Sequence, residues 1–156
     1  MIYLFIDTSI SMPTIALIKD NNILFKFHEK INNDMSSKIL PIIDVGLREN
    51  NLSITNINKI FVVNGPGSFT GVRIGVTIAK TIAWALNIPV VPLSSLEFIA
   101  TTKTDCEYIV PMIDARRGNV FAGIYDNKLN IVKEDSLISL DLLLKDINDD
   151  YELLCQ

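Results

Sequence analysis

A glycine-rich segment between a short apolar strand and a long helix constrains this chain more than any other feature. The segment is Gly65–Gly75, GPGSFTGVRIG; it follows a predicted strand at residues 59–63 and opens a helix that runs to about Leu86. Glycines let main-chain N–H groups come close to a ligand or to another backbone. A helix N-terminus adds the positive end of its dipole. The segment therefore has the form of an anion-binding turn, and a turn that only packs the helix on the sheet fits the glycine pattern equally well.

Three common motifs are absent from this segment. Gly71 is followed by Val72 and Arg73 instead of Lys and Ser or Thr, which argues against a P-loop NTPase. Thr70 stands where a dinucleotide-binding fingerprint needs its third glycine. Ser68 lacks the Gly-x-Ser-x-Gly context of a hydrolase nucleophile. The segment is therefore not the signature of any of these three enzyme classes.

Composition and charge exclude several further classes. The 156 residues are 49% hydrophobic and 21% charged, which indicates a globular chain of one domain or slightly more. The net charge of −4 disfavours direct binding of nucleic acid, so any RNA is expected to be held by a partner. No apolar run appears long enough for a membrane span, and residues 2–7 are typical of a strand and not of a signal peptide. We expect no membrane partner, a cytoplasmic location, and reduced thiols at Cys106 and Cys155.

The order of predicted elements indicates a mixed sheet with crossover helices, which is an α/β fold. Strands are predicted at residues 2–7, 14–19, 23–29, 60–63 and 89–93. Helices are predicted at 34–49, from the glycine segment to about Leu86, and after the capping sequence Ser94-Ser95-Leu96-Glu97. Asp34 or Ser36 is expected to cap the first helix, and Pro41 is expected to kink it or shift its start. These elements make an N-terminal lobe at residues 1–102.

The same pattern begins again after residue 105. Ile113-Asp114 matches Ile6-Asp7, and the turn Asp126-Asn127 matches Asp20-Asn21, which predicts an internal duplication. The second lobe, residues 106–156, has room after Asp114 for two strands, a helix near 140–147 and a strand near 151–154. It is shorter than the first lobe. We therefore expect either a chain shorter than the full gene product or a degenerate second lobe.

These features resemble the actin/hexokinase/Hsp70-like (ribonuclease H-like) superfamily. More narrowly, the chain is similar to the TsaB (YeaZ) family of bacterial tRNA threonylcarbamoyladenosine biosynthesis proteins. The matching segments are Ile6-Asp7-Thr8-Ser9, Gly65–Gly75 and Ile113-Asp114-Ala115-Arg116-Arg117-Gly118. The resemblance implies duplicated lobes, a mixed five-stranded sheet with flanking helices, and an incomplete second lobe.

The resemblance also implies that the metal site of the paralogous catalytic subunit, TsaD, is lost. TsaD-type proteins carry a His-x-x-x-His pair after the short strand that follows the glycine-loop helix, and Ser95 and Ile99 occupy those positions here. Ile99 cannot bind a metal, and Ser95 is a poor ligand. His28, the single histidine, lies on a predicted strand and is expected to be solvated or to form hydrogen bonds in the core, not to bind a metal. We expect no metal site and no catalytic residue.

Nucleotide contacts are weakly indicated. Nucleotide-binding members of the superfamily carry Asp-x-Gly in the first hairpin loop, whereas residues 7–13 here contain no glycine. Asp7 is expected to accept hydrogen bonds from its own loop, although it could orient a hydrated Mg²⁺. No tightly bound cofactor is expected, and ATP or ADP with Mg²⁺ at the junction with a partner is left open. The candidate contacts are Asp7, Thr8, Gly65, Gly67 and Ser68.

A second group of polar residues belongs to the repeated hairpin. Asp114, Arg116 and Arg117 are candidate cleft residues, where the guanidinium groups could bind an anion or a partner carboxylate. A solvated basic turn explains them equally well. Family members often carry an acidic residue where Asn119 stands, so that position has no assigned role.

The two long helices suggest a docking surface. The apolar arc of the first helix is wider than one sheet contact needs, and Trp84 lies outside the apolar arc of the second, near Arg73 and Lys80. A Trp lying flat on its own protein is the simpler alternative. The predicted interface is Met35, Ile39, Ile42, Arg73, Thr77, Lys80 and Trp84. The resemblance implies that this face pairs with a TsaD-type subunit, or with a second copy when the chain is alone, and that a TsaE-type ATPase is a further partner.

The function expected from the resemblance is that of a non-catalytic subunit that binds and activates a TsaD-type transferase. One alternative is a sugar-kinase-like ATPase that uses Asp7 and Asp114. Another is a metalloprotease-like protein of the glycoprotease superfamily. The missing histidine pair argues against the protease, and the missing loop glycine argues less firmly against the ATPase.

Overall fold

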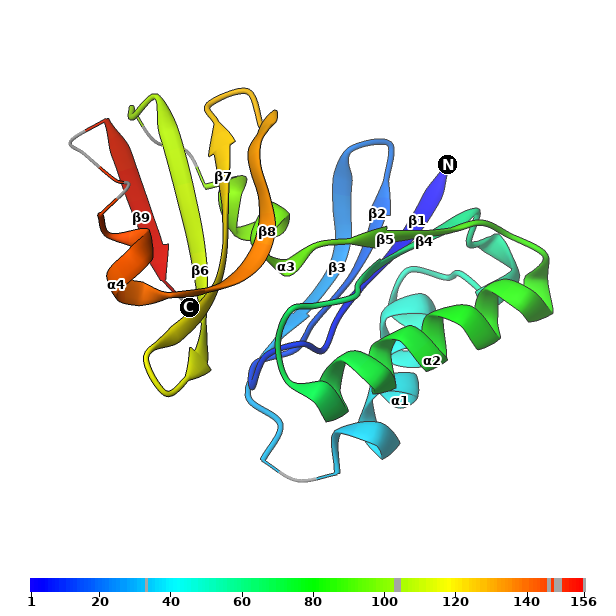
Figure 1. Ribbon diagram of the computed structural model, residues 1–156. Helices are drawn as coiled ribbons and strands as arrows, with labels where there is room; N and C mark the ends of the chain where they lie inside the picture. Colours follow the sequence, from blue (N-terminus) through cyan, green and yellow to red (C-terminus); the bar gives the residue numbers. More distant parts are fainter. Residues whose placement is uncertain (33, 103–104, 146, 148–149, 156) are drawn as a thin grey trace. The chain divides into compact units, whose positions relative to one another are not determined.

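The protein is seen here in a computed structural model that describes residues 1–32, 34–102, 105–145, 147 and 150–155. The chain forms two compact units, Met1–Leu93 and Ser94–Gln156, each built around one β-sheet (Figure 1). The predicted boundary at residues 102–106 lies after helix α3 (Ser95–Ala100), whereas α3 belongs to the second unit. It does so because it packs on two strands of that unit's sheet.

The first unit is a five-stranded mixed sheet with two long helices on one face (Figure 1). The strand order is β3-β2-β1-β4-β5; β1, β2 and β3 pair antiparallel, and β4 and β5 run parallel to β1. The strands are β1 (Ile2–Asp7), β2 (Thr14–Lys19), β3 (Asn22–His28), β4 (Lys59–Val63) and β5 (Val90–Leu93). The helices are α1 (Met35–Glu49), α2 (Phe69–Leu86) and the single turn η1 (Ile54–Asn56).

Strand periodicity decides which side chains meet the helices. Leu4 and Ile6 of β1 belong to the cluster that contains α1 and α2, while Phe5 points to the opposite face and packs with Val63. This alternation is what a two-residue period imposes on a strand buried on both faces. The main core therefore lies between the sheet and the two helices.

Helix α1 begins one residue after the predicted start. Asp34 is at the N-cap position, as expected, but its side chain accepts a bond from the Ser36 hydroxyl at 3.1 Å and caps no main-chain N–H. Pro41 lies inside the helix, which is assigned without interruption from Met35 to Glu49.

Helix α2 is, among the described helices, the one long and apolar enough by composition to cross a membrane. The sequence-based expectation did not recognise this stretch. The same composition suits a helix that covers a sheet, and α2 contacts β4 and β1, with its small residues Gly71, Gly75 and Ala79 buried. Arg73 and Lys80 lie on its exposed side. We interpret α2 as a sheet-covering helix.

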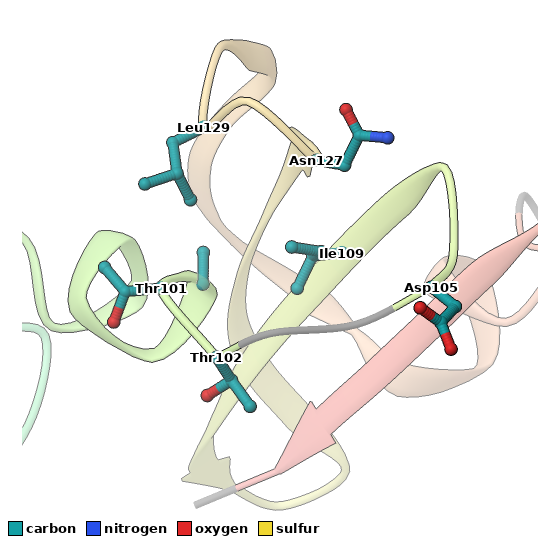
Figure 2. A pocket seen from close by; sticks show the side chains of 7 residues that line it. Thr101, Thr102, Asp105, Ile109, Asn127 and Leu129 are labelled. Carbon is teal, nitrogen blue, oxygen red and sulfur yellow. The ribbon is translucent and has the colours of Figure 1, made fainter.

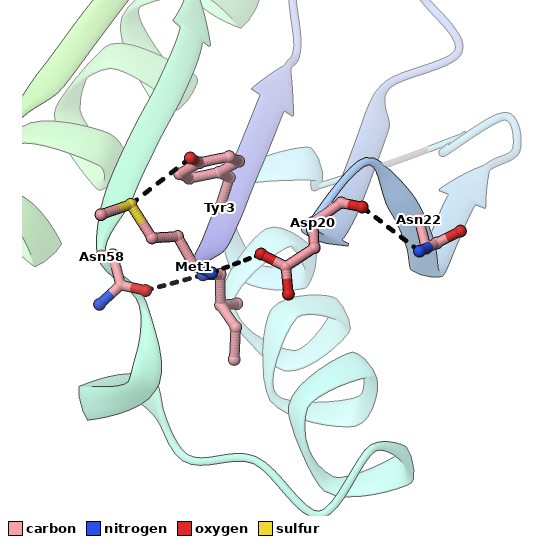
Figure 3. A network of polar contacts seen from close by, with 6 residues as sticks. Met1, Tyr3, Asp20, Asn22 and Asn58 are labelled. Carbon is pink, nitrogen blue, oxygen red and sulfur yellow. Dashed lines mark hydrogen bonds and ion pairs between the residues drawn. The ribbon is translucent and has the colours of Figure 1, made fainter.

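Polar contacts hold the start of β1 against its neighbours (Figure 3). The Met1 ammonium donates to Asp20 Oδ1 at 2.7 Å, and this hydrogen bond lowers the pKa of the Asp20 carboxyl. The Ile2 N–H donates to Asn58 Oδ1 at 2.7 Å. Because Asp20 lies in the β2–β3 turn and Asn58 precedes β4, these bonds tie one end of the sheet together.

The second unit repeats the first four strand positions of the first. Its order is β8-β7-β6-β9: β7 pairs antiparallel with β6, β8 pairs antiparallel with β7, and β9 runs parallel to β6. In the first unit β2, β3 and β4 pair in the same way around β1. The elements are β6 (Tyr108–Arg116), β7 (Asn119–Asp126), β8 (Ile131–Ser139), α4 (Leu140–Leu143) and β9 (Tyr151–Cys155). The duplicated α/β fold is thus confirmed. The helix predicted at 140–147 is shorter than expected, and residue 146 within it lies outside the described residues.

Candidate functional site

The glycine turn before α2 packs against the loop that follows β1. The Thr8 hydroxyl donates to the Gly71 carbonyl at 2.7 Å, and the Ser68 N–H donates to the Ser9 carbonyl at 2.7 Å. A Cβ added at Gly71 would overlap the Thr8 carbonyl oxygen, and one at Gly67 would lie 2.6 Å from the Ser9 carbonyl oxygen. The glycines are therefore needed because two backbones meet here.

Asp7 is occupied by its own loop, as the sequence predicted. Its Oδ1 accepts the Ser9 N–H at 2.8 Å and the Ser9 hydroxyl at 2.7 Å, and the residue is buried. Asp114, the matching residue of the second unit, accepts the Arg116 N–H at 2.7 Å and is exposed. Both carboxylates thus close the same turn, from residue i to the N–H of residue i+2.

These contacts bear on the five candidate nucleotide-binding residues, which the fold does bring together. Ser68 is the N-cap of α2 and accepts the Gly71 N–H at 3.3 Å, and Thr8 is fully buried. Gly65 adopts φ 101°, which suits glycine alone. Because Gly67 and Gly71 approach protein backbone, the turn does not offer the open glycine cradle that a phosphate needs. The contacts of these five residues with a nucleotide therefore stay a prediction.

The three candidate cleft residues lie at the tip of the β6–β7 hairpin in the second unit. Arg116 pairs with Asn119, so Arg117 and Gly118 form a two-residue loop with φ of 56° and 74°, the signature of a type I′ turn. Arg116 also has a positive φ, 68°, next to a break in strand register. Both arginines are exposed. The tip is a tight basic turn, and its role stays a prediction.

The predicted docking surface divides into buried and exposed residues. Ile39 is fully buried in the core, so its assignment to an interface was wrong; Met35 and Ile42 are half-buried and pack against that core. The physical reason is that the width of an apolar arc does not tell which part of it faces the sheet. The four predicted interface residues of α2, which are Arg73, Thr77, Lys80 and Trp84, are all exposed. We define the α2 stripe as its exposed residues at successive helical turns, namely Phe69, Arg73, Thr77, Lys80 and Trp84.

Phe69 was missed by the sequence analysis. Trp84 is 85% exposed and Phe69 is 76% exposed, so both large apolar rings point to solvent. The Arg73 guanidinium lies over the Phe69 ring, 5.2 Å from its centroid. A spacing of four residues before Arg73 is the signal that could have placed Phe69 on the same face.

Two hollows lie on the surface of α1 and α2, and one of them is lined in part by the α2 stripe. One hollow of about 340 Å³ is lined by residues that include Ser36 of α1 and Arg73, Ile74 and Thr77 of α2. Another of about 440 Å³ includes Leu40, Leu47, Ile54 and Ile82, with the Arg48–Asp44 ion pair among its lining residues. The surface of α1 and α2 therefore contains two hollows, of which the first includes Arg73 and Thr77 of the α2 stripe.

The positions that correspond to a metal pair hold no metal ligands. Ser95 is buried within α3, Ile99 is half-buried, and the His28 ring bonds the Thr14 hydroxyl across the sheet at 2.8 Å. Within the described ranges, no three His, Cys, Asp or Glu side chains gather as a metal site would require. Cys106 and Cys155 are thiols and are not joined to each other.

A polar network that sequence reasoning missed ties α3 to β7 and β8. The buried Tyr125 phenol donates to Asp135 Oδ1 at 2.6 Å, and the Ser94 hydroxyl, which caps α3, donates to Asp135 Oδ2. Burial, reinforced by the hydrogen bond to Asp135, raises the pKa of Tyr125 above its usual range. No local sequence motif predicts this network, because Ser94, Tyr125 and Asp135 lie on three different elements or their ends.

We expect the free energy of unfolding to fall above about pH 10, the ordinary tyrosine pKa. In that range the unfolded chain releases the Tyr125 proton while the folded chain keeps it, so raising the pH favours unfolding. Urea unfolding at about pH 8 and pH 11 measures the loss. The Tyr125→Phe variant controls for the other tyrosines and should lose less stability over that interval; an equal loss in both proteins would contradict the assignment.

A hollow in the second unit contains none of the predicted site residues (Figure 2). It measures about 390 Å³ and is lined by Ala100, Thr101, Thr102, Asp105, Ile109, Asn127 and Leu129. The hydroxyls of Thr101 and Thr102 donate to main-chain carbonyls of α3 at 2.7 Å and 2.9 Å. Among the lining residues that the structure describes, Asp105 is the charged one.

Comparisons with known proteins identify the family. The family model described as TsaD, tRNA N6-adenosine threonylcarbamoyltransferase, matches residues 29–150. The Bacillus subtilis protein named tRNA threonylcarbamoyladenosine biosynthesis protein TsaB is 37% identical over 135 residues, which are 86% of this chain and 59% of the relative. The protein of the same name from Buchnera aphidicola of Schizaphis graminum is 30% identical over 147 residues, 90% of this chain and 70% of the relative. The chain thus spans little more than half of the length of the Bacillus relative.

Solved structures agree with this family and with the fold. A Pseudomonas aeruginosa protein described as similar to peptidase YEAZ superposes with a TM-score of 0.79 at 26% identity, covering 88% of this chain and 66% of that one. Component A of the Acidaminococcus fermentans (R)-2-hydroxyglutaryl-CoA dehydratase, with a TM-score of 0.55 at 11% identity over 90% of this chain and 48% of its own, shares the fold alone. The chain belongs to the TsaB (YeaZ) family, within the wider family whose model is that of TsaD.

Proposed function

We propose that this chain is a non-catalytic, cytoplasmic subunit of the machinery that makes threonylcarbamoyladenosine in tRNA, and that it binds and activates a TsaD-type transferase through the α2 stripe. The names of its relatives support the pathway. The observation that carries the mode of action is the exposure of Trp84 and Phe69 on one helix face. A TsaE-type ATPase joins the same assembly.

The chemistry of the α2 stripe suits a protein interface. Aromatic and arginine side chains are enriched among residues that dominate binding energy, and lysine at the rim contributes to partner choice. The stripe offers Trp84 and Phe69 as anchors, Arg73 stacked on Phe69, and Lys80 between them. Exposed apolar groups with polar residues around them are typical of protein interaction sites.

A TsaD-type subunit fits this surface because it is built from related lobes. Because the TsaD family model matches residues 29–150, which include α1 and α2, we expect a TsaD-type lobe to carry an equivalent helix pair. Two helix pairs can meet as a four-helix layer. We expect the two hollows on the surface of α1 and α2 to receive side chains of the facing helices; their lining residues support this arrangement. When the transferase is missing, two copies of this chain pair across the same stripe.

Activation then follows from differential binding. A subunit that binds the active conformation of the transferase more tightly than the inactive one shifts the population toward the active form. The subunit needs no reactive group of its own. Positions 95 and 99 hold Ser and Ile in place of the histidine pair of TsaD-type proteins, which supports a role without catalysis for this subunit.

We expect Trp84→Ala to weaken binding to the TsaD-type transferase by about 30-fold or more, the effect of losing one dominant anchor. Titration calorimetry of the purified pair measures the dissociation constant, and circular dichroism verifies the fold. Ile23→Ala is the matched control, since Ile23 is also a large exposed apolar residue, 63% accessible, but lies on β3. Unchanged affinity of Trp84→Ala, or equal loss in Ile23→Ala, would overturn the proposed interface.

A further inference from the structure

Helix α2 differs in charge from the rest of the chain. The whole chain has a net charge of −4, whereas α2 carries the cations Arg73 and Lys80 and no acidic residue. Both cations belong to the α2 stripe and are exposed. A basic stripe on an acidic protein attracts surfaces of negative charge and repels surfaces of positive charge.

The two cations have no carboxylate partner within the described part of the chain, where no ion pair involves Arg73 or Lys80. On α1, by contrast, Arg48 pairs with Asp44 at 2.8 Å. The Arg73 guanidinium instead lies over the Phe69 ring, 5.2 Å from its centroid. Stacking on a ring orients the planar guanidinium and leaves the N–H groups at its edge free to bind a carboxylate. Arg73 is therefore positioned for an acidic group from outside the chain.

The hollow beside Arg73 has the polar groups that a carboxylate side chain needs. Its described lining residues include no acid; they are Ser36, Thr70, Arg73, Ile74, Thr77 and Ile78. The carboxylate of Asp34, just before α1, accepts the Ser36 hydroxyl at 3.1 Å and is not paired with Arg73. A guanidinium with hydroxyl groups around it is a typical donor set for a carboxylate. The hollow can thus receive an aspartate or glutamate of a facing helix.

The order of side chains along the α2 stripe determines what a second copy would meet. The stripe is the same from either end, with a ring, a cation, a hydroxyl, a cation and a ring at Phe69, Arg73, Thr77, Lys80 and Trp84. If two stripes pair antiparallel with ring on ring, Arg73 of each copy lies opposite Lys80 of the other. If they pair parallel about a two-fold axis, each cation lies opposite its own equivalent. Both arrangements bring like charges together.

We propose that the α2 stripe selects a partner helix that carries two carboxylates opposite Arg73 and Lys80, about 10 Å apart along the axis, and disfavours a second copy of this chain. The rings contribute apolar contact with either partner, and the cations favour the acidic one alone. This inference rests on the proposed function, because it takes that helix to belong to the TsaD-type transferase. It adds the charge that the transferase presents, and it makes self-pairing the weaker state.

The first test needs this chain alone. The double variant Arg73→Glu/Lys80→Glu turns the stripe acidic at exposed positions, and circular dichroism verifies its fold. Mixed with the parent protein, it should form a one-to-one pair with a dissociation constant about 10-fold lower than that of the parent with itself, because attraction replaces repulsion. Analytical ultracentrifugation with a fluorescent label on the parent measures this pairing.

Lys26→Glu/Lys128→Glu is the matched control for the double variant. It changes the net charge equally, at exposed positions on β3 and in the turn between β7 and β8. It should pair with the parent no more tightly than the parent pairs with itself. If Arg73→Glu/Lys80→Glu pairs with the parent no more tightly than this control does, the proposal is wrong.

The second test measures binding to a purified TsaD-type transferase at about 0.05 M and about 0.5 M salt. Because salt screens exposed charges, we expect transferase binding to weaken about 10-fold at the higher salt and self-association of the parent to strengthen. Transferase binding that tightens with salt, or that Arg73→Glu/Lys80→Glu leaves intact, would overturn the proposal. If the mixed pair forms but the parent binds no transferase, the proposed function fails and the charge preference of the stripe stands.

Discussion

Gly71→Ala is expected to lower the free energy of unfolding by about 3 kcal/mol, the upper part of the usual range for overpacking. The added methyl group would overlap the Thr8 carbonyl oxygen, which is backbone and cannot rotate away. Moving α2 outward to make room would also break the bond from the Thr8 hydroxyl to the Gly71 carbonyl. Urea unfolding followed by circular dichroism measures the change.

Thr70→Ala is the control for this prediction. Thr70 is the preceding residue in the first turn of α2 and is exposed, so its truncation removes no packed group. We expect its stability to stay within about 0.5 kcal/mol of the parent protein. A Gly71→Ala protein as stable as Thr70→Ala would show that the two loops can separate without loss, and the open anion cradle would then return as the better interpretation of this turn.

Ile39→Asp is expected to destabilise the protein by about 4 kcal/mol or more, enough to unfold a domain of ordinary stability. Ile39 is 0% exposed and packs among strand and helix residues of the main core. The substitution removes a large apolar side chain and places a carboxylate among apolar side chains such as Leu4, Ile15 and Ile43. Loss of the thermal unfolding transition and of far-ultraviolet helical signal would report the result.

Leu40→Asp, one residue further along α1, separates core from surface. Leu40 is 52% exposed, so an aspartate there reaches water and we expect the fold to persist. If Ile39→Asp instead stayed folded and lost only its binding to a transferase, the original assignment of Ile39 to the interface would be restored. The two neighbouring positions thus give opposite expectations from a single chemical change.

Much of the fold could be predicted because its signals are local. Alternating apolar residues placed the strands, the Ser94 capping pattern placed α3, and the match of Asp7 with Asp114 revealed the duplication that the strand orders confirm. The glycine turn was recognised, but sequence alone could not tell whether Gly67 and Gly71 approach a ligand or another backbone. That distinction depends on where the Thr8–Ser9 loop lies, which is a tertiary fact.

The misses have the same origin. Helical periodicity identifies an apolar arc on α1 but not which of Ile39 and Leu40 faces the sheet. The Tyr125–Asp135 bond joins residues on neighbouring strands whose register includes bulges, so no spacing rule predicts it. On α2, by contrast, Trp84 stood apart from the apolar arc, and its exposure was foreseen.

The matching turns at Asp7 and Asp114 bear on how catalytic residues are identified in duplicated proteins. In each lobe the Oδ1 of this aspartate accepts a hydrogen bond from the main-chain N–H two residues ahead. Asp7 is buried and Asp114 is exposed. An aspartate at this position can therefore be kept because it closes the turn of the hairpin, whether or not it takes part in a reaction. The matching positions of Asp7 and Asp114 are therefore evidence of the duplication, and a catalytic role for either aspartate needs evidence of its own.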